Sequence, residues 1–324
     1  MGLSTKLCDL LVLERPVILA PMAGVSGGAL ASAVSNAGGM GLIGGGYGDR
    51  AWLTQQIEAA GNARIGIGFI TWALERQPDL LDHALDHAPE AIFLSFGLTP
   101  TLLDRVMRSS AKLIVQVQTE AQARDALERG ADVIVAQGTE AGGHGGRRAT
   151  FPLVPAIVDI AGEVPVVAAG GIADGRGLAA ALMLGASGVL CGTRFFAAHE
   201  ALSHPNAKSR ALEAGGDETT RSSVFDVARG LDWPSDWNLR TLRNPFLDRW
   251  QADLDGLKAL GEAERLRYGN AAAGGDVEMA AVIVGEAIGL VRESRPAAEI
   301  LRMMVHEAEV LLSGASAFVT DEVR

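Results

Sequence analysis

The chain has 324 residues, of which 48% are hydrophobic and 21% charged, so it can form a large core and is not generally disordered. Its formal net charge is −11, from 28 lysines and arginines against 39 acidic residues, and no segment is dense in basic residues, so we expect no nucleic-acid partner. Two cysteines, Cys8 and Cys191, lie far apart and predict no disulfide framework.

The N-terminal segment does not have the pattern of a targeting peptide, because Asp9 and Glu14 interrupt its apolar residues. The longest apolar runs, such as residues 164–172, are too short to cross a bilayer. We therefore expect a soluble cytoplasmic protein that has no membrane partner.

Short β-rich segments alternate with amphipathic segments over residues 1–200. Strands are expected at residues 16–20, 40–43, 64–70, 91–95, 112–117, 132–137, 165–169 and 188–191. Helices are expected between them at residues 29–36, 50–60, 78–87, 101–109, 120–129, 152–161 and 177–184. Several strands, among them PVILA and LIVQV, are nearly unbroken apolar runs, which is typical of strands covered on both faces.

Eight strands that alternate with helices predict an α/β fold, specifically a (β/α)8 TIM barrel over residues 1–200. An open, doubly wound sheet is the alternative, because the spacing alone does not show that the sheet closes. The pattern changes after residue 200, where residues 201–275 show no evident β-periodic run. Two helices are then expected at residues 276–292 and 296–312, so residues 201–324 are predicted to form a helical cap or extension packed on the barrel.

Two glycine-rich loops follow the last two expected strands, where barrels of this kind often bind a phosphate group. Gly170 and Gly171 have no Cβ to block a ligand, and Asp174 can cap the helix that follows. Gly192 and Thr193 occupy the matching place after the last strand, where the hydroxyl can add a hydrogen bond. Each loop alone could be an ordinary tight turn, but two in neighbouring positions favour a phosphate site.

The loop AQGTEAGGHGGRR, residues 136–148, places His144 between two glycine pairs directly after an expected buried strand. An imidazole there can move a proton near neutral pH, and a surface histidine in a mobile loop is the alternative. His83 and His87 are one helical turn apart, but they alternate with acidic residues on an expected solvated face. We therefore expect no metal site.

Two further segments could contact a ligand at the same end of the barrel. The first loop, APMAGVSGG at residues 20–28, can support a planar apolar ligand, or it can simply form a turn that leads into a helix. Gln116 is polar within an apolar strand, so it is either a satisfied core amide or a hydrogen-bonding group at the barrel mouth.

The order of these segments resembles the nitronate monooxygenase family, formerly called 2-nitropropane dioxygenases. The resemblance covers residues 15–200 and rests on APMAG, NAGGMG, AQGTEAGGHGG, VVAAGGIADGRG and LGASGVLCGTRF in this order. The same barrel signature is shared by flavin-dependent enoyl-acyl carrier protein reductases and NADH:quinone reductases. The resemblance therefore implies FMN as cofactor and a (β/α)8 barrel.

The resemblance also implies roles for individual residues. The residues implied to lie along the isoalloxazine ring are Pro21, Met22 and Ala23. Those implied to contact the ring or the ribityl chain are Gln116, Gln137 and Gly143. Those implied to hold the phosphate are Gly170, Gly171, Gly192 and Thr193. The implied catalytic residue is His144.

The activity implied by the resemblance is oxidation of alkyl nitronates or nitroalkanes by O2 to a carbonyl compound and nitrite. The partners are then a small-molecule substrate and O2, and a homodimer is compatible with the family. Two departures concern the substrate: residues 66–69 lack the asparagine that many members have there, and Tyr268 is the only tyrosine in the C-terminal part. An NAD(P)H-dependent FMN reductase acting on a quinone or enoyl thioester is an alternative, and a non-catalytic phosphate-ligand-binding barrel is a second.

Overall fold

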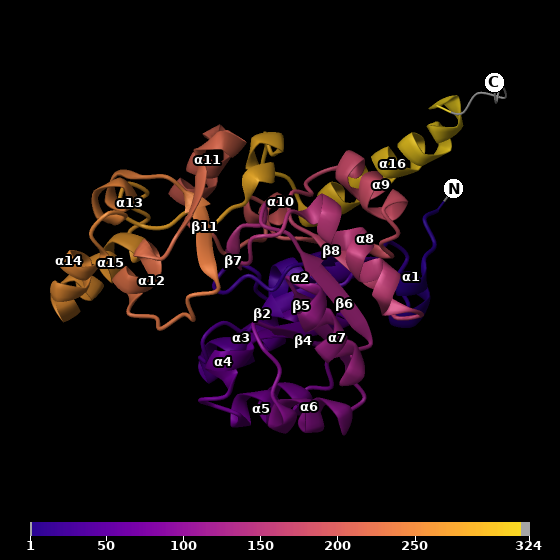
Figure 1. Ribbon diagram of the computed structural model, residues 1–324, viewed down its shortest axis with the longest axis horizontal. Coiled ribbons are helices and arrows are strands. Elements are labelled where there is room, and N and C mark those ends of the chain that lie inside the picture. The colour runs from indigo at the N-terminus through magenta and orange to yellow at the C-terminus, as the bar shows by residue number, and fades with distance from the viewer. Residues whose placement is uncertain (1, 319–324) are drawn as a thin grey trace.

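Eight parallel strands form the central sheet of residues 2–318, the part of the chain that this computed structural model describes (Figure 1). Their order is β1 (Val17–Leu19), β9 (Gly188–Cys191), β8 (Val166–Ala169), β6 (Val133–Gln137), β5 (Lys112–Val117), β4 (Ala91–Ser95), β3 (Ile65–Ile70) and β2 (Gly41–Gly44). A parallel bridge between Ile18 and Met40 joins β1 to the start of β2, so the two edges meet. The predicted (β/α)8 barrel is confirmed, and the open doubly wound sheet is excluded.

Helices cover the outside of this barrel. They are α2 (Gly28–Asn36), α3 (Arg50–Ala60), α4 (Thr71–Leu74), α5 (Asp79–Asp86), α6 (Pro100–Met107), α7 (Glu120–Glu128), α8 (Thr150–Ala161), α9 (Gly175–Met183) and α10 (Thr193–Phe196). Asp174 caps α9, because its carboxylate accepts hydrogen bonds from the backbone N–H groups of Arg176 and Gly177. Apolar side chains fill both faces of the strands, which explains the unbroken apolar runs.

A short helix that the sequence pattern does not predict, α1 (Lys6–Leu11), closes the N-terminal end of the barrel. Its residues Leu7 and Leu11 join the apolar cluster inside the barrel, together with Ile18 and Phe93. The Thr5 hydroxyl donates a hydrogen bond to the carbonyl oxygen of Ser187, just before β9. Apolar side chains of α1 therefore fill the barrel interior at this end.

A second, three-stranded antiparallel sheet lies over the opposite end of the barrel. Its order is β10 (Thr219–Ser222), β11 (Asn238–Leu242) and β7 (Gly143–Gly145). Residues 201–275, which show no evident β-periodic run, therefore contain the strands β10 and β11 as well as helices. These strands carry many polar residues, and pairing with distant parts of the chain determines their conformation rather than a local apolar alternation.

The remaining C-terminal helices form two groups (Figure 1). A lobe beside the small sheet contains α12 (Val224–Arg229), α13 (Pro245–Trp250), α14 (Leu254–Ala259) and α15 (Gly261–Ala273), and α11 (Pro205–Glu213) lies above the sheet. The predicted helix at 296–312 is confirmed as α16 (Ala297–Ser313), which packs against α9 and α2 of the barrel. No helix among residues 2–318 has the length and apolar character needed to cross a membrane.

The expected helix at residues 276–292 is wrong. The chain there has no regular secondary structure at Val282 and Val284 and forms only a 3-10 helix, η2 (Glu286–Leu290). Gly285 packs against the backbone of the His144 loop, where a Cβ would lie 2.4 Å from the carbonyl oxygen of Glu140. The apolar residues fit helical spacing, but contacts with the barrel mouth hold them in an irregular path.

We expect Leu7→Ala to lower the free energy of unfolding by about 2–5 kcal/mol, because the Leu7 side chain is fully buried in the barrel interior. Urea denaturation followed by circular dichroism would measure this. Leu266→Ala, at a site that is 65% exposed, is the control and should change stability by less than about 0.5 kcal/mol. Equal effects of the two substitutions on the free energy of unfolding would contradict the close packing of α1 in the N-terminal end of the barrel.

Candidate active site

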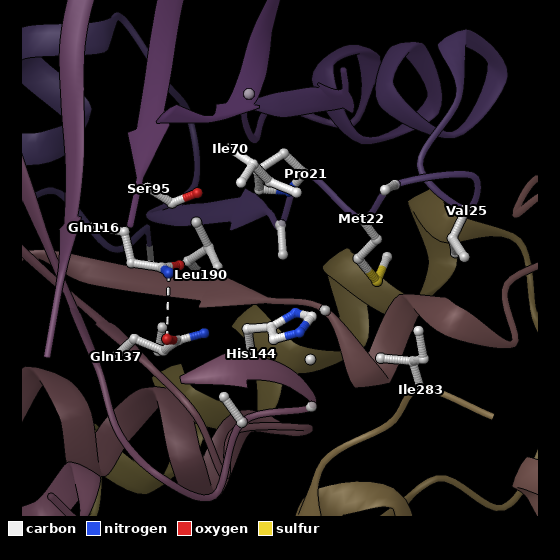
Figure 2. Close-up of a pocket in the computed structure, with 18 of the residues that line it drawn as sticks. Pro21, Met22, Val25, Ile70, Ser95, Gln116, Gln137, His144, Leu190 and Ile283 are labelled. Carbon is white, nitrogen blue, oxygen red and sulfur yellow. Dashed lines mark hydrogen bonds between the residues drawn. The ribbon is translucent and has the colours of Figure 1, made fainter. Parts of the chain in front are cut away.

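A cavity of about 200 Å³ opens at the carboxyl ends of the barrel strands (Figure 2). Parallel strands bring the loops that follow them to one mouth, so residues far apart in sequence meet there. Every residue that the sequence analysis assigns to the site lines this cavity: Pro21, Met22, Ala23, Gln116, Gln137, Gly143, His144, Gly170, Gly171, Gly192 and Thr193. Figure 2 shows Gln137 and His144 facing Pro21 and Met22 across it.

One end of the cavity is lined by backbone donors. Among the described residues, no acceptor pairs with the N–H groups of Gly171, Gly192 or Thr193. The Thr193 hydroxyl accepts a hydrogen bond of 2.8 Å from the N–H of Gly285, so its own proton is free for a ligand. Gly170 has a φ of +101°, and a Cβ there would lie 3.0 Å from a neighbouring carbonyl oxygen. These converging donors have the chemistry that a phosphate group requires.

The loop after β1 forms the neighbouring wall of the cavity, because β1 pairs with β9 and a Cβ at Gly192 would lie 3.4 Å from the Met22 sulfur. The fully buried Ser26 hydroxyl accepts a hydrogen bond of 2.7 Å from the N–H of Met22 and donates one to its carbonyl oxygen. The end of β2 packs tightly against this turn, because a Cβ at Gly44 would lie 2.4 Å from the Met22 carbonyl oxygen. Pro21 and Met22 are therefore presented on a fixed turn, as a planar ligand would need.

Amide side chains from β5 and β6 line the side of the cavity that faces Pro21 and Met22 (Figure 2). The amide of Gln116 donates a hydrogen bond of 3.2 Å to Gln137, and Gln118 donates one of 3.0 Å to the same oxygen. The Gln137 oxygen is thus satisfied within the protein, which leaves its NH2 group as the donor available to a ligand. Gln116 is therefore both a partnered amide and a residue of the barrel mouth.

His144 lies in the middle of β7 and is held there by pairing with Leu239 of β11. Its Nε2 atom lies 2.9 and 3.0 Å from the two carboxylate oxygens of Asp226, and both side chains are buried. The Trp233 indole stacks on the imidazole, with ring centroids 3.4 Å apart and planes 10° apart. His144 is therefore held on several sides, in contrast to a surface histidine in a mobile loop.

Burial lowers the pKa of His144 by disfavouring its charged form. The hydrogen bond and the charge of Asp226 oppose this shift, and the positive charges of Arg229 and Arg221 add to it. The imidazole is therefore neutral at pH 7, which is the form that accepts a proton.

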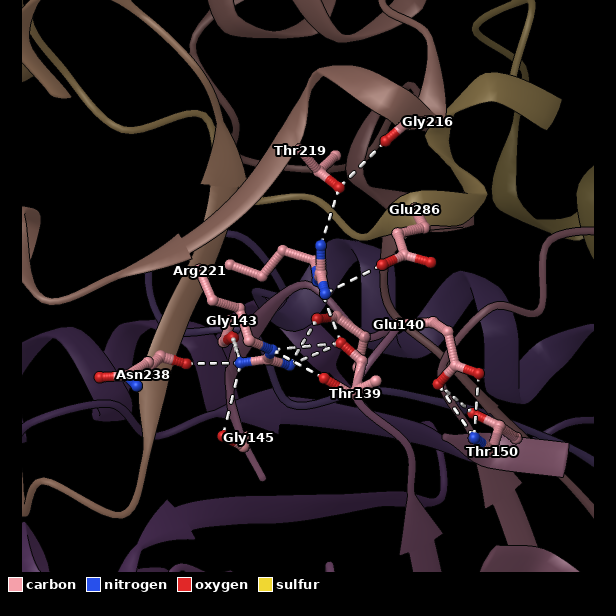
Figure 3. A network of polar contacts seen from close by, with 12 residues as sticks. Thr139, Glu140, Gly143, Gly145, Thr150, Gly216, Thr219, Arg221, Asn238 and Glu286 are labelled. Atoms are coloured by element: carbon pink, nitrogen blue, oxygen red, sulfur yellow. Dashed lines mark hydrogen bonds and ion pairs between the residues drawn. The ribbon is translucent and has the colours of Figure 1, made fainter. Parts of the chain in front are cut away.

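The His144 loop is organised by Arg221 of β10 (Figure 3). The Arg221 guanidinium donates hydrogen bonds to the carbonyl oxygens of Thr139, Ala141, Gly143, Gly145 and Asn238. Burial, followed by the neighbouring Arg240, lowers the pKa of Arg221 to about 10. The loop carbonyl groups thus point toward a buried cation, which fixes the backbone on both sides of His144.

Asp226, Arg229 and Trp233 are site residues that the sequence analysis misses. Asp226 and Arg229 are three residues apart on α12 and form an ion pair of 2.7 Å, which is a common helix-surface pattern with no catalytic signature of its own. In the sequence, Trp233 is notable only for the proline that follows it. The one available signal is an acidic residue within the apolar segment SVFDVA, residues 223–228.

A family model described as nitronate monooxygenase matches residues 4–66 and 71–307 of the chain. The nitronate monooxygenase of Neurospora crassa is 34% identical over 355 residues, which cover 94% of this chain and 92% of that protein. FabK from Thermotoga maritima has a TM-score of 0.84 and 30% identity, with 98% of this chain and 100% of that one covered. A nitroalkane oxidase from Streptomyces ansochromogenes has a TM-score of 0.80 and 26% identity, with 97% and 100% covered.

We expect Arg221→Met to lower the free energy of unfolding by about 3 kcal/mol, because it leaves buried carbonyl groups without a donor. Hydrogen exchange of the backbone in residues 139–145 should become faster, as mass spectrometry would detect. Arg243→Met is the matched control, since Arg243 pairs with Asp248 in an exposed ion pair. Unchanged exchange in residues 139–145 would contradict the role given to Arg221.

Proposed function

Because the chain belongs to the nitronate monooxygenase family, we propose that it binds FMN and oxidises alkyl nitronates, or the neutral nitroalkanes, with O2. Family membership makes the chain an oxidoreductase, so a non-catalytic barrel is set aside. In the proposed reaction two nitronate ions and one O2 give two carbonyl compounds and two nitrite ions, which balances atoms and charge. The observation that carries the proposal is that a buried histidine and a cluster of unpaired backbone donors share one cavity.

The cavity residues fit FMN in three places. Gly170, Gly171, Gly192 and Thr193 would hold the phosphate through backbone N–H groups and one hydroxyl. The amides of Gln116 and Gln137, with the backbone of Gly143, would contact the ring or the ribityl chain. Pro21, Met22 and Ala23 would lie along the isoalloxazine ring. When bound, FMN supplies the electron-accepting group and the reaction with O2.

His144 would act on the substrate beside the ring. A neutral imidazole can take the α-proton from a nitroalkane, whereas a positively charged one would be needed to pair with an anionic nitro group. The lowered pKa of His144 therefore favours the role of general base. The surrounding aromatic side chains, among them Phe96 and Trp233, limit access of water to this end of the cavity.

The similarity to FabK supports a second candidate function, an NAD(P)H-dependent FMN reductase acting on a quinone or an enoyl thioester. The sequence resemblance already extends to enoyl reductases with this barrel signature, and the same cavity would serve them. This candidate differs from the first in requiring a nicotinamide nucleotide as reductant.

We expect His144→Gln to lower kcat/KM for a nitroalkane by about 10²- to 10⁴-fold, because the group that accepts the proton is lost. FMN content, measured from the flavin absorption bands, should be retained, since His144 is not among the proposed phosphate ligands. The control is His306→Gln, at an exposed histidine of α16. A His144→Gln protein that retained FMN and full nitroalkane turnover would overturn this role.

The pH dependence of kcat/KM for a nitroalkane should follow the ionisation of His144. A lowered pKa keeps the His144 imidazole neutral, and able to accept a proton, down to pH values below the ordinary histidine pKa of about 6.5. Consequently kcat/KM for a nitroalkane should be level near neutral pH and fall only below about pH 6.5, as the imidazole becomes protonated. Initial rates measured from acid to mildly alkaline pH would test this. A fall that begins above about pH 7 would be inconsistent with a buried neutral histidine.

A further inference from the structure

The His144 ring is bound by the protein through only one of its two nitrogen atoms. Nε2 contacts both oxygens of Asp226, whereas Nδ1 has no hydrogen-bond partner among residues 2–318. Nδ1 is also not among the buried polar atoms that are sealed from solvent without a partner, and His144 lines the cavity. The nitrogen open to a ligand is therefore Nδ1.

Asp226 is itself fixed by α12. Its Oδ1 accepts a hydrogen bond of 2.7 Å from the Arg229 guanidinium, which also donates to the carbonyl oxygen of Phe225. Since a carboxylate only accepts hydrogen bonds, the hydrogen in the contact with His144 is the one on Nε2. The neutral imidazole then has its lone pair on Nδ1.

Trp233 restricts the remaining motion of the ring. The stacked indole prevents the imidazole from tilting out of its plane, and the indole N–H donates a hydrogen bond of 3.1 Å to the hydroxyl of Tyr47. The Asp226 contact opposes rotation within the plane. The orientation of His144 is thus set by residues 226–233, a segment of the C-terminal lobe and not of the barrel.

We propose that Asp226, held by Arg229, is a positioning residue that keeps hydrogen on Nε2 of His144 and so makes Nδ1 the atom that accepts the substrate proton. This rests on the proposed nitroalkane oxidation. The C–H bond at the α-carbon breaks, its electron pair stays on the nitroalkane to form the nitronate, and the proton bonds to Nδ1. The resulting imidazolium is paired with Asp226 until Nδ1 releases the proton to water.

Several charged groups face His144 and bear on its titration. They are Asp226 and Arg229 of α12 and Arg221 of β10. The Tyr47 hydroxyl accepts a hydrogen bond from the Trp233 indole. The central guanidinium carbon of Arg229 lies 5.9 Å from the centroid of the Tyr47 ring. Replacing Asp226 removes the one negative charge in this set, so the acid limb of the pH profile should move to lower pH.

The test compares Asp226→Asn with Asp232→Asn, a control at an exposed carboxylate of the same segment. Asp226→Asn should lower kcat/KM for a nitroalkane by about 10²- to 10⁴-fold. Turnover of the corresponding nitronate, which has already lost its α-proton, should change by less than about threefold, and this also shows that the variant is folded. Equal losses with both substrates, or no loss with either, would overturn the proposal.

A second readout does not depend on activity. Long-range ¹⁵N–¹H correlation spectra at neutral pH should show His144 with hydrogen on Nε2 in the unsubstituted protein, with its signal assigned by loss in His144→Gln. In Asp226→Asn the amide can donate to Nε2, and the hydrogen should move to Nδ1. Hydrogen on Nδ1 in the unsubstituted protein would overturn the proposal. If the protein oxidised neither substrate, only the proposed function would fail, and the spectra would still decide the role of Asp226.

Discussion

The antiparallel pairing of β7 with β11 is the constraint on which the candidate active site depends. It joins a glycine-rich loop of the barrel to a strand almost a hundred residues later, and so brings Asp226 and Trp233 onto His144. Arg221 strengthens the same junction by binding the loop carbonyl groups. A flexible loop alone would leave the imidazole exposed and free to rotate, whereas this arrangement gives it one bound and one open nitrogen atom.

The two parts of the molecule therefore contribute differently to the site. The barrel supplies a rigid mouth in which glycines such as Gly170 let backbone donors approach a ligand. The C-terminal lobe supplies Asp226 and Trp233, which orient His144. Substitutions in the barrel loops should thus affect cofactor binding, and those in α12 should affect proton transfer. The two effects should differ because the barrel loops supply the backbone donors of the cavity, whereas α12 supplies the contact with His144.

The sequence was sufficient for the barrel, because buried parallel strands such as β5 are apolar throughout and are recognisable locally. The common mouth of parallel strands was also sufficient to collect the glycine loops and His144, whereas Gln137 and Gly143 were assigned through the family resemblance. It was not sufficient for β10 and β11, whose polar residues form strands only through distant partners. Likewise, Val282 and Val284 fit helical spacing yet lie outside any helix, and the position of Asp226 beside His144 became evident only from the fold.

The most direct test of the central claim is to add propyl nitronate to the purified protein without NAD(P)H and to measure O2 consumption and nitrite together. The account predicts a yellow protein that forms two nitrite ions for each O2 consumed. A protein that forms no nitrite, and whose flavin bands are instead bleached by NADH under anaerobic conditions, would contradict it and identify a reductase.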